Sequence, residues 1–448
     1  MPNNDRPGPD IFTSPLARDL AGALLERFCR YVRIDTQSRR DRAGSPSTPG
    51  QLVLGRLLAD ELREVGLEDA GLDANGYVTA TLPRNVDGPG PVVGLLAHLD
   101  TTPDTPSSGV EPIVHHGYRG GVIELPKNGT RLDPRDMPEL AEKHGHDLVT
   151  ASGETLLGAD DKAGVAEVMT AVAYLAAHPE IPRPTLRVAF TPDEEIGEGA
   201  TLFDIDRFGA DFAYTLDGSE RGELQDETFS ALEAIVTVYG VDVHPGQATG
   251  KLVNALRLAT RIVALLPQQL TPEATSDREG FIHVYAVTGT PSKTTFRAIL
   301  RDFDDEALNR HRELLERLAH EVIDPEPRAR VTGEVREQYR NMRRYLERVP
   351  NVLAAAEAAI RAEGIEPVRK PIRGGTDGSR LSEMGLPTPN LFTGGHEYHS
   401  VREWTSLQDM AAAAATIIQL AEAWTRPEYA LAPDVRGRAA PAGARSAS

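Results

Sequence analysis

Cysteine, aromatic residues and long apolar runs are all scarce in this chain of 448 residues. The only cysteine is Cys29, which excludes both an intrachain disulfide and a thiolate metal cluster. Any metal must therefore be held by histidine and carboxylate side chains. The sequence has no apolar run of about 18 residues that would span a membrane, and its first residues lack the pattern of a secretory signal. We expect a cytoplasmic protein with no membrane partner.

Positive charge is scarce as well. The chain has 48 Lys and Arg residues against 67 Asp and Glu residues, so its formal net charge is −19. Binding to a nucleic-acid backbone needs a basic surface that displaces counterions, and this class of partner is therefore excluded. Part of the acid excess fits a carboxylate cluster that a divalent cation would neutralise, although most of it is surface charge.

The length of the chain favours more than one domain. We predict a catalytic domain formed by residues 1–228 and 341–426, interrupted by an inserted domain at 229–340. Residues 1–15 and 427–448 are rich in Pro, Gly, Ala, Ser and Arg without periodicity, which is typical of flexible ends.

Helix and strand patterns alternate outside the insert, which predicts an α/β domain with a mostly parallel sheet between helices. Helices are predicted at 16–34, 51–65, 351–364 and 406–424, with a further one after Asp160. Strands are predicted at 77–82, 92–97, 186–190, 212–216 and 389–392.

The insert has a different order of elements: strand, helix, strand, strand, helix, strand. These elements are predicted at 232–244, 254–266, 280–289, 294–302, 304–323 and 328–339. The order is that of the split βαβ, or ferredoxin-like, α+β module.

The stretch Thr155-Leu-Leu-Gly-Ala-Asp-Asp-Lys-Ala-Gly-Val165 is the centre of the predicted site. An apolar approach ends there in two adjacent carboxylates, and an amphipathic helix pattern follows. We interpret Asp160 as the hub of a metal site. The alternative for its neighbour Asp161 is an N-cap of the helix.

Four further segments are apolar strands that end in potential metal ligands. They are Gly94-Leu-Leu-Ala-His-Leu-Asp100, Arg187-Val-Ala-Phe-Thr-Pro-Asp-Glu-Glu195, Ala213-Tyr-Thr-Leu-Asp217 and Asn390-Leu-Phe-Thr-Gly-Gly-His-Glu-Tyr-His399. Sites in open α/β sheets form beyond the carboxyl ends of the strands, so these residues are expected to converge with Asp160.

The sequence spacing suggests different roles for some of these residues. His98 and Asp100 are two residues apart, so in an extended chain they face the same side, and Asp100 can orient the imidazole of His98 as a ligand. Glu194 and Glu195 are adjacent and point differently, so one can coordinate a cation while the other reaches a bound water. This division suits hydrolysis at a pair of metal ions.

These motifs resemble those of the peptidase T family of tripeptide aminopeptidases, within the dinuclear-zinc M20 metallopeptidases. The resemblance runs from about Arg27 to Trp424. Its carriers are Ile34-Asp-Thr-Gln-Ser, Ala97-His-Leu-Asp-Thr, Thr155-Leu-Leu-Gly-Ala-Asp-Asp-Lys-Ala-Gly, Val188-Ala-Phe-Thr-Pro-Asp-Glu-Glu, Tyr214-Thr-Leu-Asp-Gly, His244-Pro-Gly, Arg301-Asp-Phe-Asp, Lys370-Pro-Ile-Arg-Gly-Gly-Thr-Asp-Gly and Asn390-Leu-Phe-Thr-Gly-Gly.

The resemblance implies a metal-dependent aminopeptidase with two Zn²⁺ ions per subunit, which Mn²⁺ or Co²⁺ could replace. One zinc is held by His98 and Asp217 and the other by Glu195 and His399, with Asp160 bridging them. Glu194 becomes the general base that activates the bridging water, with Asp100 beside it in the catalytic group. The resemblance also implies a cis peptide bond between Asp160 and Asp161, and a lid or homodimer contact formed by the inserted domain.

The same resemblance assigns His244, Arg301 and Arg373 to the peptide substrate. An imidazole can stabilise a developing oxyanion, and a guanidinium can bind a terminal carboxylate with two hydrogen bonds. A purely structural role for at least one of the three is the alternative.

Departures from the family pattern affect loops. Gly-Ser-Glu-Arg follows Asp217 where a glycine run is expected, and Ser400 stands where we expect glycine. His396 competes with His399 as a ligand, and family position favours His399. We interpret four other histidines as solvated: His115, His116, His144 and His146.

Other functions are weighed against this one. A related amidohydrolase of the same superfamily, such as a dipeptidase, carboxypeptidase or N-acyl amino acid deacylase, would share the metal chemistry. A non-catalytic metal-binding relative would have lost Glu194 or a ligand, and all are present. The turn Gly374-Gly-Thr-Asp-Gly378 lacks the ending of a phosphate-binding loop, which excludes nucleotide binding.

Overall fold

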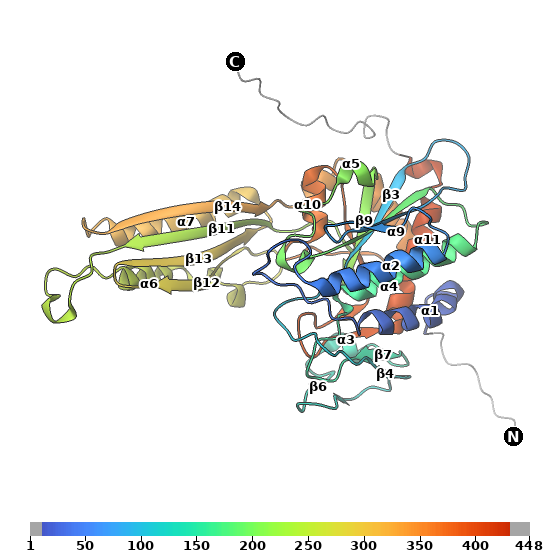
Figure 1. The fold of residues 1–448 in the computed structure, drawn as a ribbon, viewed down its shortest axis with the longest axis horizontal. Coiled ribbons are helices and arrows are strands. Elements are labelled where there is room, and N and C mark those ends of the chain that lie inside the picture. Colours follow the sequence, from blue (N-terminus) through green and yellow to red (C-terminus); the bar gives the residue numbers. More distant parts are fainter. Residues whose placement is uncertain (1–10, 431–448) are drawn as a thin grey trace, which may run out of the picture. The chain divides into compact units, whose positions relative to one another are not determined.

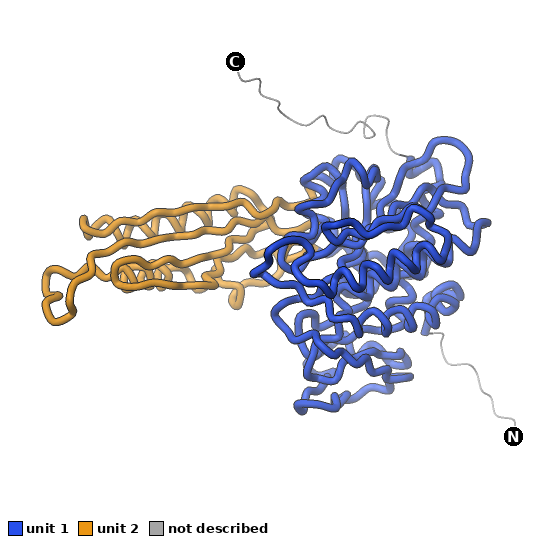
Figure 2. The backbone as a smooth tube through the Cα atoms, in the orientation of Figure 1, with its two compact units in different colours: residues 1–226, 344–370, 376–448 blue, residues 227–343, 371–375 orange. Residues whose placement is uncertain are grey.

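The computed structural model describes residues 11–430, and the chain divides into two compact units (Figure 2). Unit 1 comprises residues 1–226, 344–370 and 376–448, and unit 2 comprises residues 227–343 and 371–375. The short segment 371–375 therefore belongs to the inserted unit, although it follows the insert by some thirty positions in the sequence. Within 11–430, no helix combines the length and the apolar character that crossing a membrane requires.

Unit 1 is built on an 8-stranded sheet (Figure 1). Its strands, in spatial order, are β1 (Gly71–Leu72), β2 (Val78–Leu82), β8 (Thr185–Thr191), β3 (Val92–His98), β9 (Phe212–Gly218), β16 (Asn390–Phe392), β10 (Glu223–Gln225) and β15 (Val368–Arg369). The central strands β8, β3, β9 and β16 are parallel, as is the pair β10 and β15. The pairs β1–β2, β2–β8 and β10–β16 are antiparallel. The sheet is therefore mixed, and the predicted parallel order applies chiefly to its centre.

Helices cover both faces of this sheet. They are α1 (Pro15–Tyr31), α2 (Pro49–Glu64), α4 (Ala159–Ala177), α9 (Pro350–Ala362), α10 (Asp377–Met384) and α11 (Leu407–Ala423). Helix α4 contacts β3 and β9, and α1 and α11 pack on α4. On the other face, Leu96 and Ala213 join a core that includes Phe203, Phe208 and Leu381. Packed side chains thus hold both faces of the sheet whose strand ends carry the site.

A side-chain cap begins α1. The Ser14 hydroxyl accepts a hydrogen bond from the backbone N–H of Ala17 at 3.0 Å, and Pro15 takes the first position of α1. Residues 11–14, predicted as part of a loose end, are thus tied to α1. Residues Pro427–Tyr429 form a 3-10 helix rather than a loose end, whereas 1–10 and 431–448 lie outside the described residues.

A second, 4-stranded sheet in unit 1 was not predicted. Its order is β17 (Gly395–His396), β18 (Trp404–Ser406), β7 (Leu148–Thr150) and β4 (Ile113–His115). Each strand is only two or three residues long, too short for a pattern of alternating polarity to be recognised. Trp404 packs there with Leu148 and Leu132. This sheet joins the segment after His396 to the middle of the chain.

The smaller elements of the same part of the chain are β5 (Ile123–Glu124), β6 (Arg131–Leu132) and α3 (Pro138–Ala141).

Unit 2 contains a 4-stranded antiparallel sheet with the order β12 (Phe281–Gly289), β13 (Lys293–Asp302), β11 (Ser230–Tyr239) and β14 (Arg330–Tyr339). Helices α6 (Ala255–Leu265) and α7 (Asp305–Ile323) pack on one face (Figure 1). The element order is the split βαβ order that the sequence predicts. Its function as a lid or dimerisation domain stays a prediction.

The first strand of unit 2 ends earlier than predicted. β11 stops at Tyr239, whereas the predicted strand continued to 244. The Cβ that a side chain would add at Gly240 would lie 2.1 Å from the carbonyl oxygen of Val253, so the chain is packed too closely there for any other residue. His244 precedes Pro245 and caps a 3-10 helix instead of continuing the strand.

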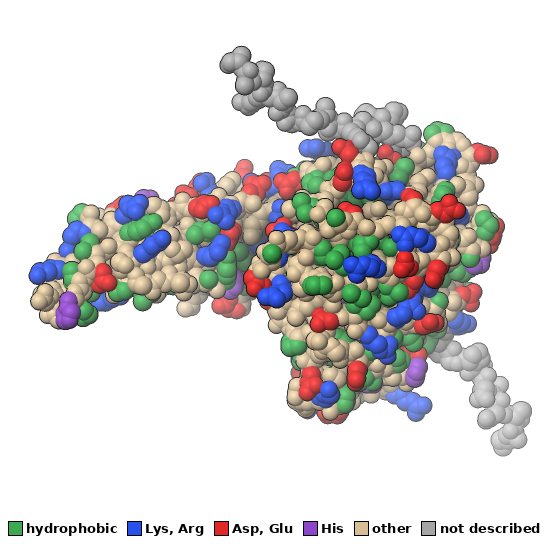
Figure 3. Space-filling view, viewed as in Figure 1, with side chains coloured by type: hydrophobic (Ala, Val, Ile, Leu, Met, Phe, Trp, Pro, Cys, Tyr) green, Lys and Arg blue, Asp and Glu red, His purple; other side chains and the backbone are tan. Residues whose placement is uncertain are grey.

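Acidic and basic side chains are interspersed over the face of the molecule drawn in Figure 3. This distribution agrees with the interpretation that most of the acid excess is surface charge.

Candidate metal centre

The predicted ligands lie at the carboxyl ends of neighbouring strands in unit 1. His98 is the last residue of β3, and Asp217 lies near the end of the parallel neighbour β9. Glu194 and Glu195 follow β8, the neighbour on the other side, in the 3-10 helix η1 (Glu194–Ile196). Asp160 lies in the first turn of α4. Parallel strands end at one edge of a sheet, which is why residues from distant segments meet here.

Two groups of potential metal ligands share Asp160. In the first, Nε2 of His98 is 2.9 Å from Oδ1 of Asp160 and 3.7 Å from Oδ1 of Asp217. In the second, Nε2 of His399 is 3.2 Å from Oδ2 of Asp160 and 2.9 Å from Oε2 of Glu195. The donor atoms of each group lie within 4.8 Å of one another. Asp160 thus presents a different carboxylate oxygen to each group, as a carboxylate that bridges two metal ions does.

The donor atoms fit a pair of divalent cations. Each group offers one imidazole nitrogen and two carboxylates, a set that suits Zn²⁺, Mn²⁺ or Co²⁺. Oε1 of Glu195 is buried and has no hydrogen-bond partner among the described residues. A buried carboxylate oxygen without a partner is costly, and a cation would satisfy it.

The electrostatics of the centre indicate an excess of buried negative charge. Burial, followed by the carboxylates of Asp217, Asp377 and Glu195, raises the pKa of Glu194 well above its ordinary value. Burial, followed by Asp160, raises the pKa of Glu195 to about 8. Burial alone would lower the pKa of the His399 imidazole, but Asp160 and Glu195 raise it to about 11. Positive charge is therefore strongly favoured among these groups, and divalent cations supply it.

Asp100 makes more contacts than the sequence-based prediction assigned to it. Nδ1 of His98 is 3.0 Å from the backbone carbonyl oxygen of Asp100 and 3.5 Å from its carboxylate, which therefore lies beside the imidazole as expected. The same carboxylate accepts hydrogen bonds from the backbone N–H groups of Glu194 at 2.9 Å and Glu195 at 3.2 Å. Asp100 thus contacts the imidazole through its backbone and its side chain, and the two glutamates through its side chain.

The alternative that Asp161 caps the helix is wrong. The Asp160–Asp161 peptide bond is cis, as the resemblance implies, and both residues have non-helical backbone angles. The N-cap position belongs to Gly158, at a φ of 84°. The Asp161 carboxylate accepts a hydrogen bond at 3.0 Å from the backbone N–H of His98. Asp161 therefore fixes the end of β3, where the first ligand lies.

His396 belongs to neither ligand group. Its ring is buried and stacks on Trp404 with centroids 4.0 Å apart, and its Nδ1 is 3.3 Å from Oε1 of Glu220. Burial lowers the pKa of His396 to about 3. These contacts favour His399 as the ligand.

The two departures from the family pattern fill structural positions near the centre. The hydroxyl of Ser219 donates to the carbonyl of Gly395 at 2.7 Å, and Arg221 forms an ion pair with the buried Asp409 at 3.1 Å. The hydroxyl of Ser400 donates to the carbonyl of Glu397 at 2.8 Å. These side chains support the loops around the centre.

The prediction of four solvated histidines is wrong for His146. Its ring is 7 % exposed, and its Nδ1 lies 2.7 Å from the Ser406 hydroxyl, because the unpredicted small sheet covers it. His115 is half-buried, with Nε2 2.9 Å from the Thr150 hydroxyl. His116 and His144 are exposed, as predicted.

Sequence reasoning missed several buried charged residues around the centre. Asp377, in the Gly-rich turn, accepts a hydrogen bond from the Thr191 hydroxyl at 2.7 Å, and burial raises its pKa to about 7. The Lys162 ammonium donates to the carbonyl of Ile34 at 2.8 Å. Glu403 accepts hydrogen bonds from the segment that carries Asp160. Asp377 and Lys162 lie in motifs that were recognised, whereas Glu403 lies in a polar stretch without a motif.

The three predicted substrate residues all lie in unit 2. His244 is exposed, and its Nδ1 accepts a hydrogen bond from the backbone of Gly246 at 3.2 Å. Arg301 is half-buried and donates to Oε1 of Gln338 at 2.8 Å. Their predicted role in substrate binding stays a prediction.

Arg373 is more strongly engaged than the other two. Its Nη1 donates to the carbonyls of Asp277 and Glu279, both at 2.9 Å. Its Nη2 donates to the hydroxyl of Thr275 at 2.9 Å and to the carbonyl of Thr275 at 3.3 Å. These four bonds use the Nη1 and Nη2 groups of Arg373, so only its Nε–H is left for a contact with substrate unless some of them are broken.

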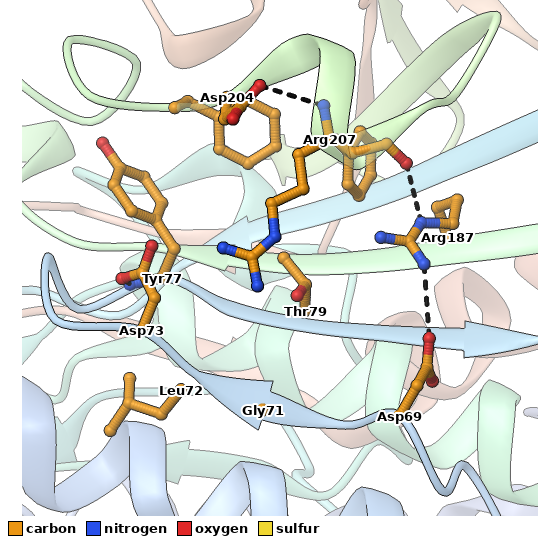
Figure 4. Close-up of a pocket in the computed structure, with 11 residues that line it drawn as sticks. Asp69, Gly71, Leu72, Asp73, Tyr77, Thr79, Arg187, Asp204 and Arg207 are labelled. Atoms are coloured by element: carbon orange, nitrogen blue, oxygen red, sulfur yellow. Dashed lines mark hydrogen bonds and ion pairs between the residues drawn. The ribbon is translucent and has the colours of Figure 1, made fainter.

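A separate cavity of about 140 Å³ lies beside β1, β2 and α5 (Ile205–Phe208) (Figure 4). Arg187 lines it and donates to the carbonyl of Phe208 at 2.7 Å, and it pairs with Asp69 at 3.4 Å. The carboxylate of Asp204 accepts a bond from the backbone of Arg207 at 2.9 Å. No predicted site residue lines this cavity, so it is not part of the metal centre.

Comparison with known proteins decides the family. Residues 156–423 match the model of peptidase family M20/M25/M40. A Peptidase T from Geobacillus kaustophilus is 48% identical over 89% of this chain and 97% of its own length. The chain belongs to peptidase family M20. A Peptidase T from Bacillus subtilis is 46% identical to this M20 chain over 89% of it and 98% of the relative. The resemblance predicted from the motifs is thereby confirmed.

Several solved structures share the fold. An aminopeptidase PepT from Bacillus cereus superposes with a TM-score of 0.69 at 21% identity, covering 91% of this chain and 99% of that chain. A tripeptidase from Staphylococcus aureus gives a TM-score of 0.71 at 18% identity over the same shares. The Bacillus subtilis YXEP protein, described as a dinuclear metal binding peptidase of the M20 family, gives 0.60 at 16% identity, covering 90% of this chain and 98% of that chain.

Proposed function

We propose that this M20 chain is a metal-dependent aminopeptidase that releases the N-terminal residue from tripeptides. The observation that carries the proposal is the position of Asp160, whose two carboxylate oxygens face His98 and His399 separately. The substrate class is supported by the similarity to the 48% identical Peptidase T and to the S. aureus tripeptidase.

The metal ions are assigned to the two ligand groups. His98 and Asp217 would hold one ion, Glu195 and His399 the other, and Asp160 both. We propose Zn²⁺ at both positions, with Mn²⁺ or Co²⁺ as functional substitutes because imidazole and carboxylate ligands suit all three. Two such ions, when bound, lower the pKa of a water held between them and polarise the peptide carbonyl.

Glu194 is the proposed proton carrier. It follows the same strand as Glu195 but belongs to neither ligand group, so its carboxylate is left to accept a proton. It takes the proton of the attacking water and then delivers that proton to the nitrogen of the leaving amine. The Asp100 carboxylate accepts a hydrogen bond from the backbone N–H of Glu194 at 2.9 Å. This bond fixes the backbone from which the Glu194 side chain extends.

We propose that Arg301 and His244 contact the peptide from unit 2. Arg301 would bind the terminal carboxylate of the tripeptide, and His244 would stabilise the developing oxyanion. Arg373 would act mainly by holding the segment 275–279 through its four hydrogen bonds. Arg301→Ala should raise KM for a tripeptide, and an unchanged KM would remove Arg301 from the substrate site.

The experiment that tests the function is hydrolysis of a matched panel by the purified, zinc-loaded protein. The panel contains trialanine, dialanine, tetra-alanine and N-acetyl-trialanine. Cleavage largely confined to free trialanine, with release of its first residue, is expected. Cleavage of dialanine or of the acetylated peptide instead would reassign the chain to a related dipeptidase, carboxypeptidase or deacylase. No cleavage by the metal-loaded protein would favour a non-catalytic relative.

We propose two further properties. The first is a homodimer formed through unit 2, which the resemblance implies, and the second is a cytoplasmic location. Light scattering tests the first, and fractionation of cells that produce the protein tests the second.

A further inference from the structure

Glu403 makes an unusual set of contacts with the segment that carries the shared ligand. It is 1 % exposed. Its Oε2 accepts hydrogen bonds from the backbone N–H groups of Leu157 and Gly158, both at 2.8 Å, and its Oε1 accepts one from the N–H of Asp160 at 3.0 Å. One buried carboxylate therefore accepts three backbone hydrogen bonds from a stretch of four residues.

The segment depends on this acceptor because it supplies no cap of its own. Gly158 occupies the N-cap position of α4, where no side chain of the helix accepts a hydrogen bond. Buried backbone N–H groups at the start of a helix need a partner, and a carboxylate is a strong one because of its charge. The hydrogen bond to Glu403 thereby fixes the backbone of Asp160, the residue whose side chain faces both ligand groups.

Glu403 also belongs to the loop that carries the second histidine ligand. It lies four positions after His399, and its own backbone N–H donates to the carbonyl of Ser400 at 3.2 Å. Arg402, its neighbour, pairs with Glu397 at 2.6 Å. The same side chain thus ties the His399 loop to the Asp160 segment, two parts of the chain that lie more than 200 residues apart in sequence.

We propose that Glu403 is a positioning residue for the metal centre. It holds the backbone of Asp160 against the His399 loop, so that the two carboxylate oxygens of Asp160 are directed to separate metal ions. This inference rests on the proposed function, because it assigns Asp160 as the bridging ligand. The competing explanation is that Glu403 only caps α4 and contributes to folding.

The choice of substitution separates these explanations. In Glu403→Gln one carboxylate oxygen becomes an NH₂ group. If the remaining oxygen keeps the bonds to Leu157 and Gly158, the NH₂ group faces the N–H of Asp160 and that bond is lost. The matched control is Glu363→Gln. Glu363 is also 1 % exposed.

The control changes a carboxylate that accepts a comparable number of hydrogen bonds away from the ligands. The Glu363 carboxylate accepts bonds from the hydroxyls of Ser14 at 2.6 Å and Thr13 at 3.3 Å, and from the amide of Gln419 at 3.2 Å. None of these partners belongs to the ligand groups.

The experiment is a Co²⁺ titration of metal-free wild type, Glu403→Gln and Glu363→Gln. It records the number of ions bound, the affinity and the visible absorption spectrum, together with the melting temperature of each metal-free protein. Glu403→Gln is expected to weaken Co²⁺ binding about 10- to 100-fold and to change the spectrum, since a change in ligand orientation alters the geometry around the ion. Glu363→Gln is expected to lower the melting temperature while leaving the number of ions, the affinity and the spectrum unchanged.

The possible failures are distinguishable. If Glu403→Gln binds two Co²⁺ ions with wild-type affinity and spectrum, Glu403 is only a cap and the inference is wrong. If wild type itself binds no Co²⁺, the proposed function fails, and the inference fails with it. Should Glu403→Gln not fold, Glu403→Asp keeps the charge on a shorter side chain and is judged by the same titration, with weaker binding expected and wild-type binding overturning the inference.

Discussion

Glu194 is the residue on which the proposed proton transfer depends. Replacing it by alanine in Glu194→Ala removes the carboxylate but none of the atoms assigned to hold metal. Turnover of trialanine should fall about 100- to 10,000-fold, the usual contribution of a general base, while two metal ions remain bound. The measurement is kcat together with metal content by elemental analysis.

The control for this variant is Glu198→Ala, which removes an acidic side chain from the same loop. Glu198 pairs with Arg42 at 2.8 Å and belongs to neither ligand group. It should keep most of the activity. Near-normal turnover by Glu194→Ala would show that another group carries the proton.

The candidate metal ligands could be brought together from the sequence because few side chains bind such ions and they recur at strand ends. His98 and Asp217 lie at the ends of apolar strands and Glu195 follows one, so an elementary rule about parallel sheets brings them together. Glu403 could not be found in this way. Its role depends on three backbone N–H groups more than 240 residues earlier, and no local pattern encodes such a contact.

Helix α4 approaches the sheet so closely that its glycine cannot be replaced. A Cβ at Gly164 would lie 2.0 Å from the carbonyl oxygen of Leu216 and 2.5 Å from Oδ1 of Asp161. Gly164→Ala would therefore separate the segments that carry Asp160 and Asp217. It should destabilise the protein by about 1 to 3 kcal/mol and weaken metal binding. Chemical denaturation and a metal titration measure the two effects.

The matched control lies in α1. Gly22 is exposed, and a Cβ there would have no atom within 4 Å. Gly22→Ala should increase stability by about 0.5 to 1 kcal/mol, because alanine favours the helix. Equal effects of the two substitutions would contradict the close packing of α4 on β9.

Glu167 makes the interior of α4 sensitive to pH. Its carboxylate is fully buried, and neither oxygen has a hydrogen-bond partner within the described part of the chain. Burial raises the pKa of Glu167 well above its ordinary value. The folded protein therefore keeps this proton to a higher pH than the unfolded chain does. The stability that the bound proton confers is lost as pH rises from about 4.5 through the raised pKa of the folded state.

Glu167→Gln removes this ionisation and keeps the shape of the side chain. The variant should match wild type near pH 4 and become progressively more stable than wild type as pH rises above about 4.5, by about 1.4 kcal/mol for each pH unit until the raised pKa is reached. Urea unfolding across this range measures the difference. The control Glu64→Gln changes an exposed residue of α2 and should give no such trend. A constant difference between Glu167→Gln and wild type at all pH values would refute the argument.

Long elements were predictable, and short ones were not. The predicted helices 254–266 and 304–323 correspond closely to α6 and α7, since each has an apolar face repeated over several turns. β4, β7, β17 and β18 have two or three residues each, so periodicity cannot reveal them. The wrong prediction for His146 follows from this, because the missed sheet is what buries it.

Unit 2 presents apolar side chains on the outer strands of its sheet. Val287 of β12 is 44 % exposed and Val335 of β14 is 39 % exposed. β12 and β14 are the edge strands, and each has one side unpaired within the sheet. Exposed apolar groups on unpaired edges favour association with another chain. This observation supports the homodimer that the resemblance implies.

The double variant Val287→Asp, Val335→Asp should therefore be a monomer, because two charges per chain would have to be buried at the contact. Light scattering should give twice the 48.5 kDa mass of the chain for wild type and the single mass for the variant. The control places two aspartates on unit 1, at Val53 and Met384, which are 51 % and 47 % exposed. It should remain a dimer. A monomeric wild type would defeat the prediction outright, and a dimeric double variant would move the contact away from these strands.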